Sequence, residues 1–105
     1  MASSVHAEGF SKIDDRDRFV SIVDGRSLTR FGIRLSVTPD GEITGRAFGR
    51  DISGAWRWRG GYFCRSLFWG QTNLGPNCQA VKVQGKTMRF ISDRGAGRYA
   101  DLNLR

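Results

Sequence analysis

Arginines that alternate with tryptophans are the residues of this sequence best suited to chemistry. The run Trp56 to Arg59 has a period of two, and Arg65 follows shortly after Gly60-Gly61. A period of two places one residue type on each face of a strand. Guanidinium groups in a row suit carboxylate or phosphate, because the planar group donates two parallel hydrogen bonds. The sequence therefore predicts an anion-binding strand face formed by Arg57, Arg59 and Arg65, with the tryptophans in the core. The alternative is that these arginines only solvate the outer face.

A second candidate region runs from Phe68 to Asn77 and mixes bulky apolar residues with turn formers. We expect a long loop here, because glycine, proline and asparagine interrupt the strand pattern. Loops on a rigid scaffold often carry binding residues. Phe68 and Trp69 are therefore predicted to be the apolar anchor of the site. The alternative is that Phe68, Trp69 and Leu74 fold inward and plug one end of the domain.

The two cysteines, Cys64 and Cys78, stand at the two ends of this region. We expect a disulfide, which would stabilise the fold by roughly 3 kcal/mol through loop closure in the unfolded chain. Disulfides persist in oxidising compartments, so a periplasmic or secreted protein is predicted. The residues 5–7 also resemble the end of a secretory cleavage site, although no apolar segment precedes them. The alternative to the disulfide is a pair of buried free thiols in a cytosolic protein. The alternative to a cleavage site is a flexible leader.

Catalytic and metal-binding patterns find little support. The single histidine, His6, lies far from both cysteines, so no zinc ligand set can be assembled. The chain has no nucleotide-binding glycine motif, and most carboxylates downstream of residue 24 fall in predicted turns. No run of about 20 apolar residues could span a membrane. We therefore expect a non-enzymatic protein without metal or cofactor.

The charge of the chain is uneven. Residues 1–24 carry five acidic and three basic side chains, whereas residues 25–105 carry five acidic and fourteen basic ones. A basic body suits an acidic protein partner or an anionic ligand. The alternative is a cytosolic single-stranded nucleic-acid binder of OB-like character, in which Trp58 or Tyr62 stacks on bases. Fourteen arginines against three lysines can also reflect a GC-rich genome.

These residues must be positioned by a small β-rich domain, because 105 residues suffice for one domain. Residues 1–10 are predicted to be a disordered leader, and 11–105 a single domain. Asp15 and Gly25 bracket a predicted helix over about 15–23, with a strand over 18–23 as the alternative. The fold class is mainly β: an antiparallel, barrel-like meander of about eight short strands. Strands are predicted at 27–31, 33–38 and 42–48, in the hairpin 53–67, and at 78–83, 87–92 and 98–104.

The sequence also carries short resemblances to known proteins. Gly54-Ala55-Trp56 resembles the Gly-x-Trp motif of lipocalin-like barrels, which include small secreted inhibitors of bacterial metalloproteases. The order of features from Phe19 to Leu104 looks like that of uncharacterised small secreted proteobacterial domains. These features are a short helix, an Asp-Gly turn, Gly-x-Trp-x-Trp, Gly-Tyr-Phe-Cys, a second cysteine and a late Gly-x-Gly. The first resemblance implies an eight-stranded barrel with one disulfide, and the second implies no particular active site.

Overall fold

The computed structural model describes residues 9–105, so the cleavage-like residues 5–7 and most of the expected leader lie outside the described residues. The described chain is mainly β, with one α-helix. Its elements, in chain order, are β1 (Ser11–Lys12), α1 (Arg16–Val23), β2 (Ser27–Arg30), β3 (Ile33–Val37), β4 (Glu42–Ala47), β5 (Arg50–Arg59), β6 (Tyr62–Trp69), β7 (Thr72–Gln84), β8 (Thr87–Ile91), the 3-10 helix η2 (Asp93–Gly95) and β9 (Tyr99–Leu104).

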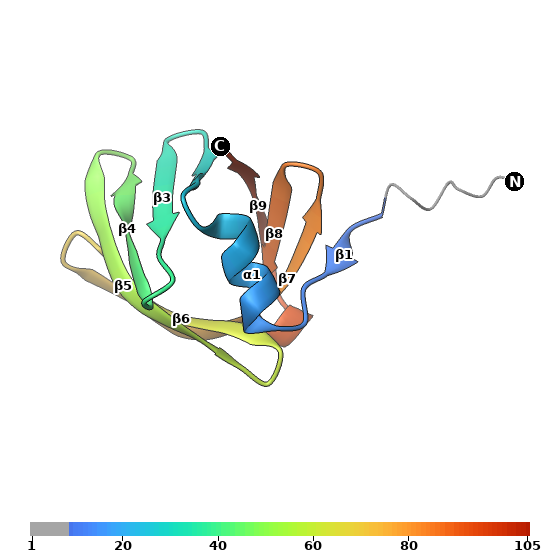
Figure 1. The fold of residues 1–105 in the computed structure, drawn as a ribbon. Helices are drawn as coiled ribbons and strands as arrows, with labels where there is room; N and C mark the ends of the chain where they lie inside the picture. Colours follow the sequence, from blue (N-terminus) through green and yellow to red (C-terminus); the bar gives the residue numbers. More distant parts are fainter. Residues whose placement is uncertain (1–8) are drawn as a thin grey trace, which may run out of the picture.

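The strands β2 to β9 form a closed antiparallel barrel of eight strands (Figure 1). Each strand pairs with the next along the chain, and β9 returns to pair with β2 through Leu28↔Leu104 and Thr29↔Asn103. The short β1 pairs with the C-terminal part of β7 through Ser11↔Val83 and Lys12↔Lys82, beyond the residues of β7 that pair with β6. The predicted fold class, an antiparallel eight-stranded meander, is confirmed. Closure matters because it removes the exposed strand edges that promote aggregation.

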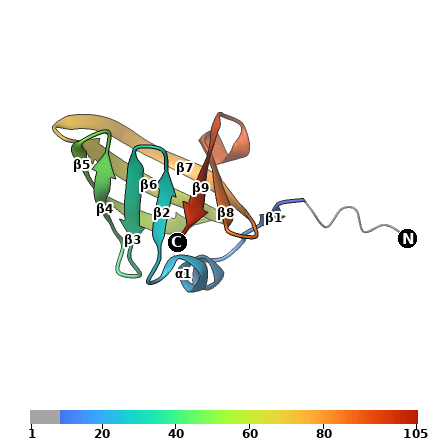
Figure 2. The same cartoon turned by 90° about the horizontal axis from the view of Figure 1, so that it is seen from above.

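The helix α1 lies across one end of the barrel (Figures 1 and 2). Asp15 caps it by accepting a hydrogen bond from the Arg18 backbone N–H at 2.8 Å. Gly25 follows with φ +76°, a left-handed conformation that favours glycine after a helix end. The buried Phe19 packs on the rings of Trp56, Trp58 and Phe63 at centroid distances of 5.1–5.2 Å. The helix is confirmed, and it seals this end with apolar side chains.

Alternation along the strands sorts side chains between the barrel interior and its outer face. In β5, Ile52 and Trp56 are buried, while Arg57 and Arg59 are exposed. Gly60 and Gly61 turn the chain into β6 with φ of +56° and +87°, as a tight two-residue hairpin requires. The core placement of Trp56 is confirmed, and its indole Nε1 donates to the Thr38 carbonyl at 2.9 Å.

Two expectations about the strands are wrong. The segment 49–52 between the predicted strands 42–48 and 53–67 is expected to be a turn, but the observed turn is shorter, because β5 already begins at Arg50. The predicted loop 68–77 is a hairpin: β6 continues to Trp69, and β7 begins at Thr72. The turn formers sit in a β-bulge, where Leu67 pairs with Gly75 and Phe68 with Asn73, leaving the intervening Leu74 as an extra residue. A bulge accommodates glycine inside a strand, which explains the misleading local composition.

Candidate functional site: a basic groove on the outer face

A groove of about 640 Å³ lies on the outer face of β5, β6 and β7. Residues directly opposite one another on paired strands share a face. Arg57 pairs with Cys64, and Cys64 pairs with Cys78, so these three residues form one row across the wall. Arg59 pairs with Tyr62 in the next row towards the hairpin turn. We call this site the basic groove; its main lining residues on the outer face are Arg57, Arg59, Tyr62, Cys64, Pro76, Cys78 and Arg94, and the inner-face pair Trp56 and Arg65 also borders it.

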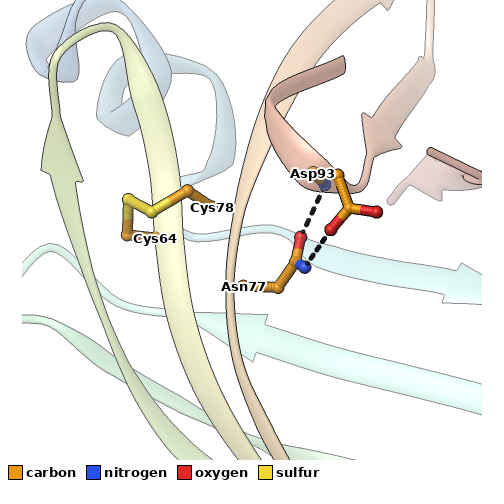
Figure 3. The surroundings of a disulfide bond; sticks show 4 residues. All are labelled: Cys64, Asn77, Cys78 and Asp93. Carbon is orange, nitrogen blue, oxygen red and sulfur yellow. Dashed lines mark hydrogen bonds between the residues drawn. A yellow bond between two sulfur atoms is a disulfide. The ribbon is translucent and has the colours of Figure 1, made fainter. Parts of the chain in front are cut away.

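The disulfide between Cys64 and Cys78 joins β6 to β7 in this wall (Figure 3). The two Cα atoms are 3.9 Å apart. The expected pairing is confirmed, and it lies in the groove and not in the core. Since the bridge prevents β6 and β7 from separating here, it holds the flanking arginines at fixed spacing. A disulfide is compatible with an oxidising, extracytoplasmic location.

A third arginine reaches the groove from the far end of the chain. Asn77 and Asp93 bond reciprocally: the Asn77 amide donates to the Asp93 carboxylate at 2.9 Å, and the Asp93 backbone N–H donates to Asn77 Oδ1 at 3.0 Å (Figure 3). These bonds fasten η2 to β7. Arg94, with φ +54°, lines the groove, and its Cζ lies 5.9 Å from the centre of the Tyr62 ring. The two hydrogen bonds between Asn77 and Asp93 therefore determine where the adjacent Arg94 lies.

The groove is strongly cationic. Its lining includes three exposed arginines and no carboxylate. Within residues 9–105, none of the three guanidinium groups forms an ion pair. Lys12 Nζ also lies 5.2 Å from the centre of the Tyr62 ring. A concave surface with several uncompensated cations attracts anions over a distance of about one Debye length.

Arg65 does not belong to the arginine row that the sequence predicts. It pairs with Trp56, so its side chain shares the inner face. Its guanidinium Nη1 donates to the Gly75 carbonyl at 2.9 Å, and burial lowers its pKa because desolvation penalises the charged form. The reason is register: a two-residue turn at Gly60-Gly61 places odd residues of β5 opposite even residues of β6.

The two predicted aromatic anchors also lie on different faces. Phe68 is on the outer face and 42% exposed. Trp69 points inward and donates from Nε1 to the Ala47 carbonyl at 2.7 Å. The centre of its ring lies 4.7 Å from Arg50 Cζ. Neither residue lines the basic groove. The inward alternative therefore holds for Trp69, while Phe68 and Leu74 stay exposed.

No pattern in the sequence singles out Arg94. Its neighbours Asp93 and Gly95 indicated a turn, but no local pattern shows where a turn residue will lie. Arg57 and Arg59 are the predicted residues that the fold does bring together, with the predicted disulfide beside them. Trp58 faces the core and donates to the Asp14 carbonyl at 3.2 Å, which leaves Tyr62 as the aromatic residue of the groove.

The fold and the groove define a class: a small closed β-barrel with a cationic, disulfide-braced outer wall. Comparison of the chain with protein-family models, curated proteins and solved structures found no match. The resemblance to lipocalin-like inhibitors and to small secreted proteobacterial domains stays a prediction. Within residues 9–105, no helix has the length and apolarity needed to cross a membrane. The same residues hold no group of three or more potential metal ligands among histidine, cysteine and acidic residues.

Proposed function

We propose that this barrel is a non-enzymatic binding domain of the periplasm or the extracellular space, which holds an acidic protein segment or an anionic ligand in the basic groove. The observation that carries the proposal is the convergence of Arg57, Arg59 and Arg94 on one groove without a carboxylate partner in the described chain. Like charges so arranged repel one another, and a bound anion relieves that repulsion.

The chemistry of the groove suits carboxylates that are presented on a peptide. Guanidinium groups donate paired hydrogen bonds to carboxylates, and the half-buried Tyr62 and the exposed Pro76 add apolar contact between them. The disulfide keeps the arginines in place before binding, so less conformational freedom is lost when the ligand arrives. The extracytoplasmic location in this proposal is supported by that disulfide.

The test uses a fluorescein-labelled hexaglutamate peptide and fluorescence polarisation at low salt, where exposed charges are least screened. The variant Arg57→Ser/Arg59→Ser removes two groove cations. The matched control Arg26→Ser/Arg98→Ser removes two exposed arginines outside the groove, so the net charge changes equally. We expect about a tenfold weaker affinity for the groove variant and less than about a twofold change for the control. Equal losses would show that only net charge matters and would refute the proposal.

The same assay addresses the nucleic-acid alternative. An unlabelled oligothymidylate is added as competitor over a range of salt concentrations. We expect weak competition, because of the two aromatic residues that border the described groove Trp56 is buried, which leaves Tyr62 for base stacking. Tighter binding of the oligonucleotide than of the peptide, with a steep salt dependence, would replace the acidic-partner proposal with nucleic-acid binding.

A further inference from the structure

The barrel interior is not filled from end to end. Beyond the core layer that α1 seals, a cavity of about 200 Å³ lies inside the barrel. Most of its lining is aliphatic or aromatic, from β2, β3, β4, β6, β8 and β9. Three of the apolar residues that line this cavity are only half-buried: Ile33, Leu35 and Leu67. Solvent therefore reaches the lumen. Two of its lining residues, Arg30 and Ile33, flank the β2–β3 turn, and this turn lies at the end of the barrel opposite α1 (Figure 2).

A charged side chain interrupts this apolar wall. Arg65 lines the lumen, and its hydrogen bond within residues 9–105 is the one to the Gly75 carbonyl. No carboxylate lines the lumen; the other polar residues are Arg30 and Gln79. Gln79 is 8% exposed, and its Nε2 donates to Ser92 Oγ at 3.4 Å. A desolvated guanidinium without a counter-ion costs stability, and an apolar residue of similar size would avoid that cost.

We propose that the lumen binds a small apolar molecule that carries a single carboxylate, with Arg65 as the residue that holds the carboxylate. A guanidinium has five N–H donors, and the Gly75 carbonyl engages one nitrogen. The remaining donors can bind both oxygens of a carboxylate side by side. Arg30 also lines the lumen but is exposed to solvent, so Arg65 is the lumen arginine that is partly buried. One partly buried guanidinium balances one charge, so a monoanion suits the site better than a dianion.

The volume sets the size of the apolar part. An apolar cavity of about 150 Å³ accommodates benzene, so about 200 Å³ suits a medium-length alkyl chain or one substituted aromatic ring. Small barrels commonly hold one such ligand in their interior. The lumen and the basic groove lie on opposite faces of the same wall, and Arg65 is the described residue that borders both.

Isothermal titration calorimetry with octanoate tests the proposal, and 1-octanol serves as the neutral probe with the same alkyl chain. The wild type is expected to bind octanoate saturably and to bind 1-octanol more weakly. The variant Arg65→Met keeps an unbranched side chain of similar reach and removes the charge. We expect it to bind octanoate about tenfold or more weakly than the wild type while 1-octanol affinity changes by less than about twofold.

Two further variants separate this role from a purely structural one. Arg57→Met removes an arginine from the outer face of the neighbouring strand and should leave octanoate binding unchanged. Leu35→Phe fills the lumen and should abolish binding of both probes while the protein stays folded, as judged by circular dichroism. If octanoate and 1-octanol bind equally, or if Arg65→Met binds octanoate as the wild type does, the proposal is wrong. Absence of saturable octanoate binding in the millimolar range would also overturn it.

Discussion

Arginines on two walls of this barrel meet different surroundings. On β8, Arg89 donates from Nε and Nη2 to the two oxygens of Asp101 at 2.8 and 3.0 Å. Its Cζ lies 4.1 Å from the centre of the Phe10 ring and 3.9 Å from that of Tyr99. On the β5–β6–β7 wall, Arg57 and Arg59 form neither an ion pair nor a cation–π contact within the described chain.

The two walls show that the number of arginines on a surface does not by itself identify a binding site. Both walls carry exposed cations, so counting charges does not distinguish them. The fold itself supplies a counter-ion to Arg89, and that arginine therefore contributes to holding β8 against β9. The fold supplies none to the groove arginines, although it braces them with a disulfide and with buried tryptophan behind. Rigid support without charge compensation is the arrangement expected of a binding surface.

The largest expected effect comes from the support behind the groove. Trp56→Ala should lower the free energy of unfolding by roughly 3–5 kcal/mol, the usual cost of deleting a buried large aromatic side chain. Trp56 is 6% exposed and contacts Phe19 and Phe63. Urea unfolding followed by circular dichroism measures the change. Phe68→Ala is the control, because its exposed ring should matter by no more than about 0.5 kcal/mol. A wild-type transition in Trp56→Ala would refute the core placement.

The second effect tests the brace across the groove. Cys64→Ser/Cys78→Ser, or reduction of the wild type, should cost about 3 kcal/mol through loop entropy. It should also weaken hexaglutamate binding, because β6 and β7 are then less firmly joined. Alkylation under denaturing conditions with mass spectrometry reports the bridge directly: the cysteines should take up label only after reduction. Full labelling without reductant, in protein refolded in air, would contradict the bridge.

The smallest effect tests the paired wall. Bidentate hydrogen bonds from Arg89 lower the pKa of Asp101 below its ordinary value. This carboxylate therefore contributes stability above its unfolded pKa, near 4, and loses that contribution as the pH falls through its lower folded pKa. Wild-type melting temperature should drop more steeply below about pH 4 than that of Asp101→Asn, by a few degrees at most because the pair is partly exposed.

The groove variant provides the control for this acid titration. Arg57→Ser/Arg59→Ser should show the same acid dependence as the wild type, since these arginines have no carboxylate partner in the described chain. An altered acid profile in this variant would mean that a carboxylate does pair with the groove arginines. The distinction between the two walls would then fail.

Much of the fold could be predicted from short stretches of sequence. Asp15 and Gly25 carry helix-end chemistry in their own side chain and backbone freedom, and the tandem glycines after Arg59 force a tight hairpin. Alternation put Trp56 inside and Arg57 outside. Arg65 is a different case: the turn fixes the register, so pairing it with Trp56 required only counting from Gly60-Gly61. The prediction that Arg65 shares a face with Arg57 and Arg59 was therefore wrong although the sequence contained the information needed to avoid it.

By itself, the sequence determined the elements, the faces of the strands and the pair of cysteines, because turns, caps and alternation act over a few residues. Only the tertiary structure decided that Arg94 joins Arg57 in one groove, and that β2 meets β9 to close the barrel. It also decided that the interior keeps a lumen beside Arg65. These features depend on contacts between residues far apart in the chain and on the total volume of the side chains that meet inside. No local pattern encodes either quantity.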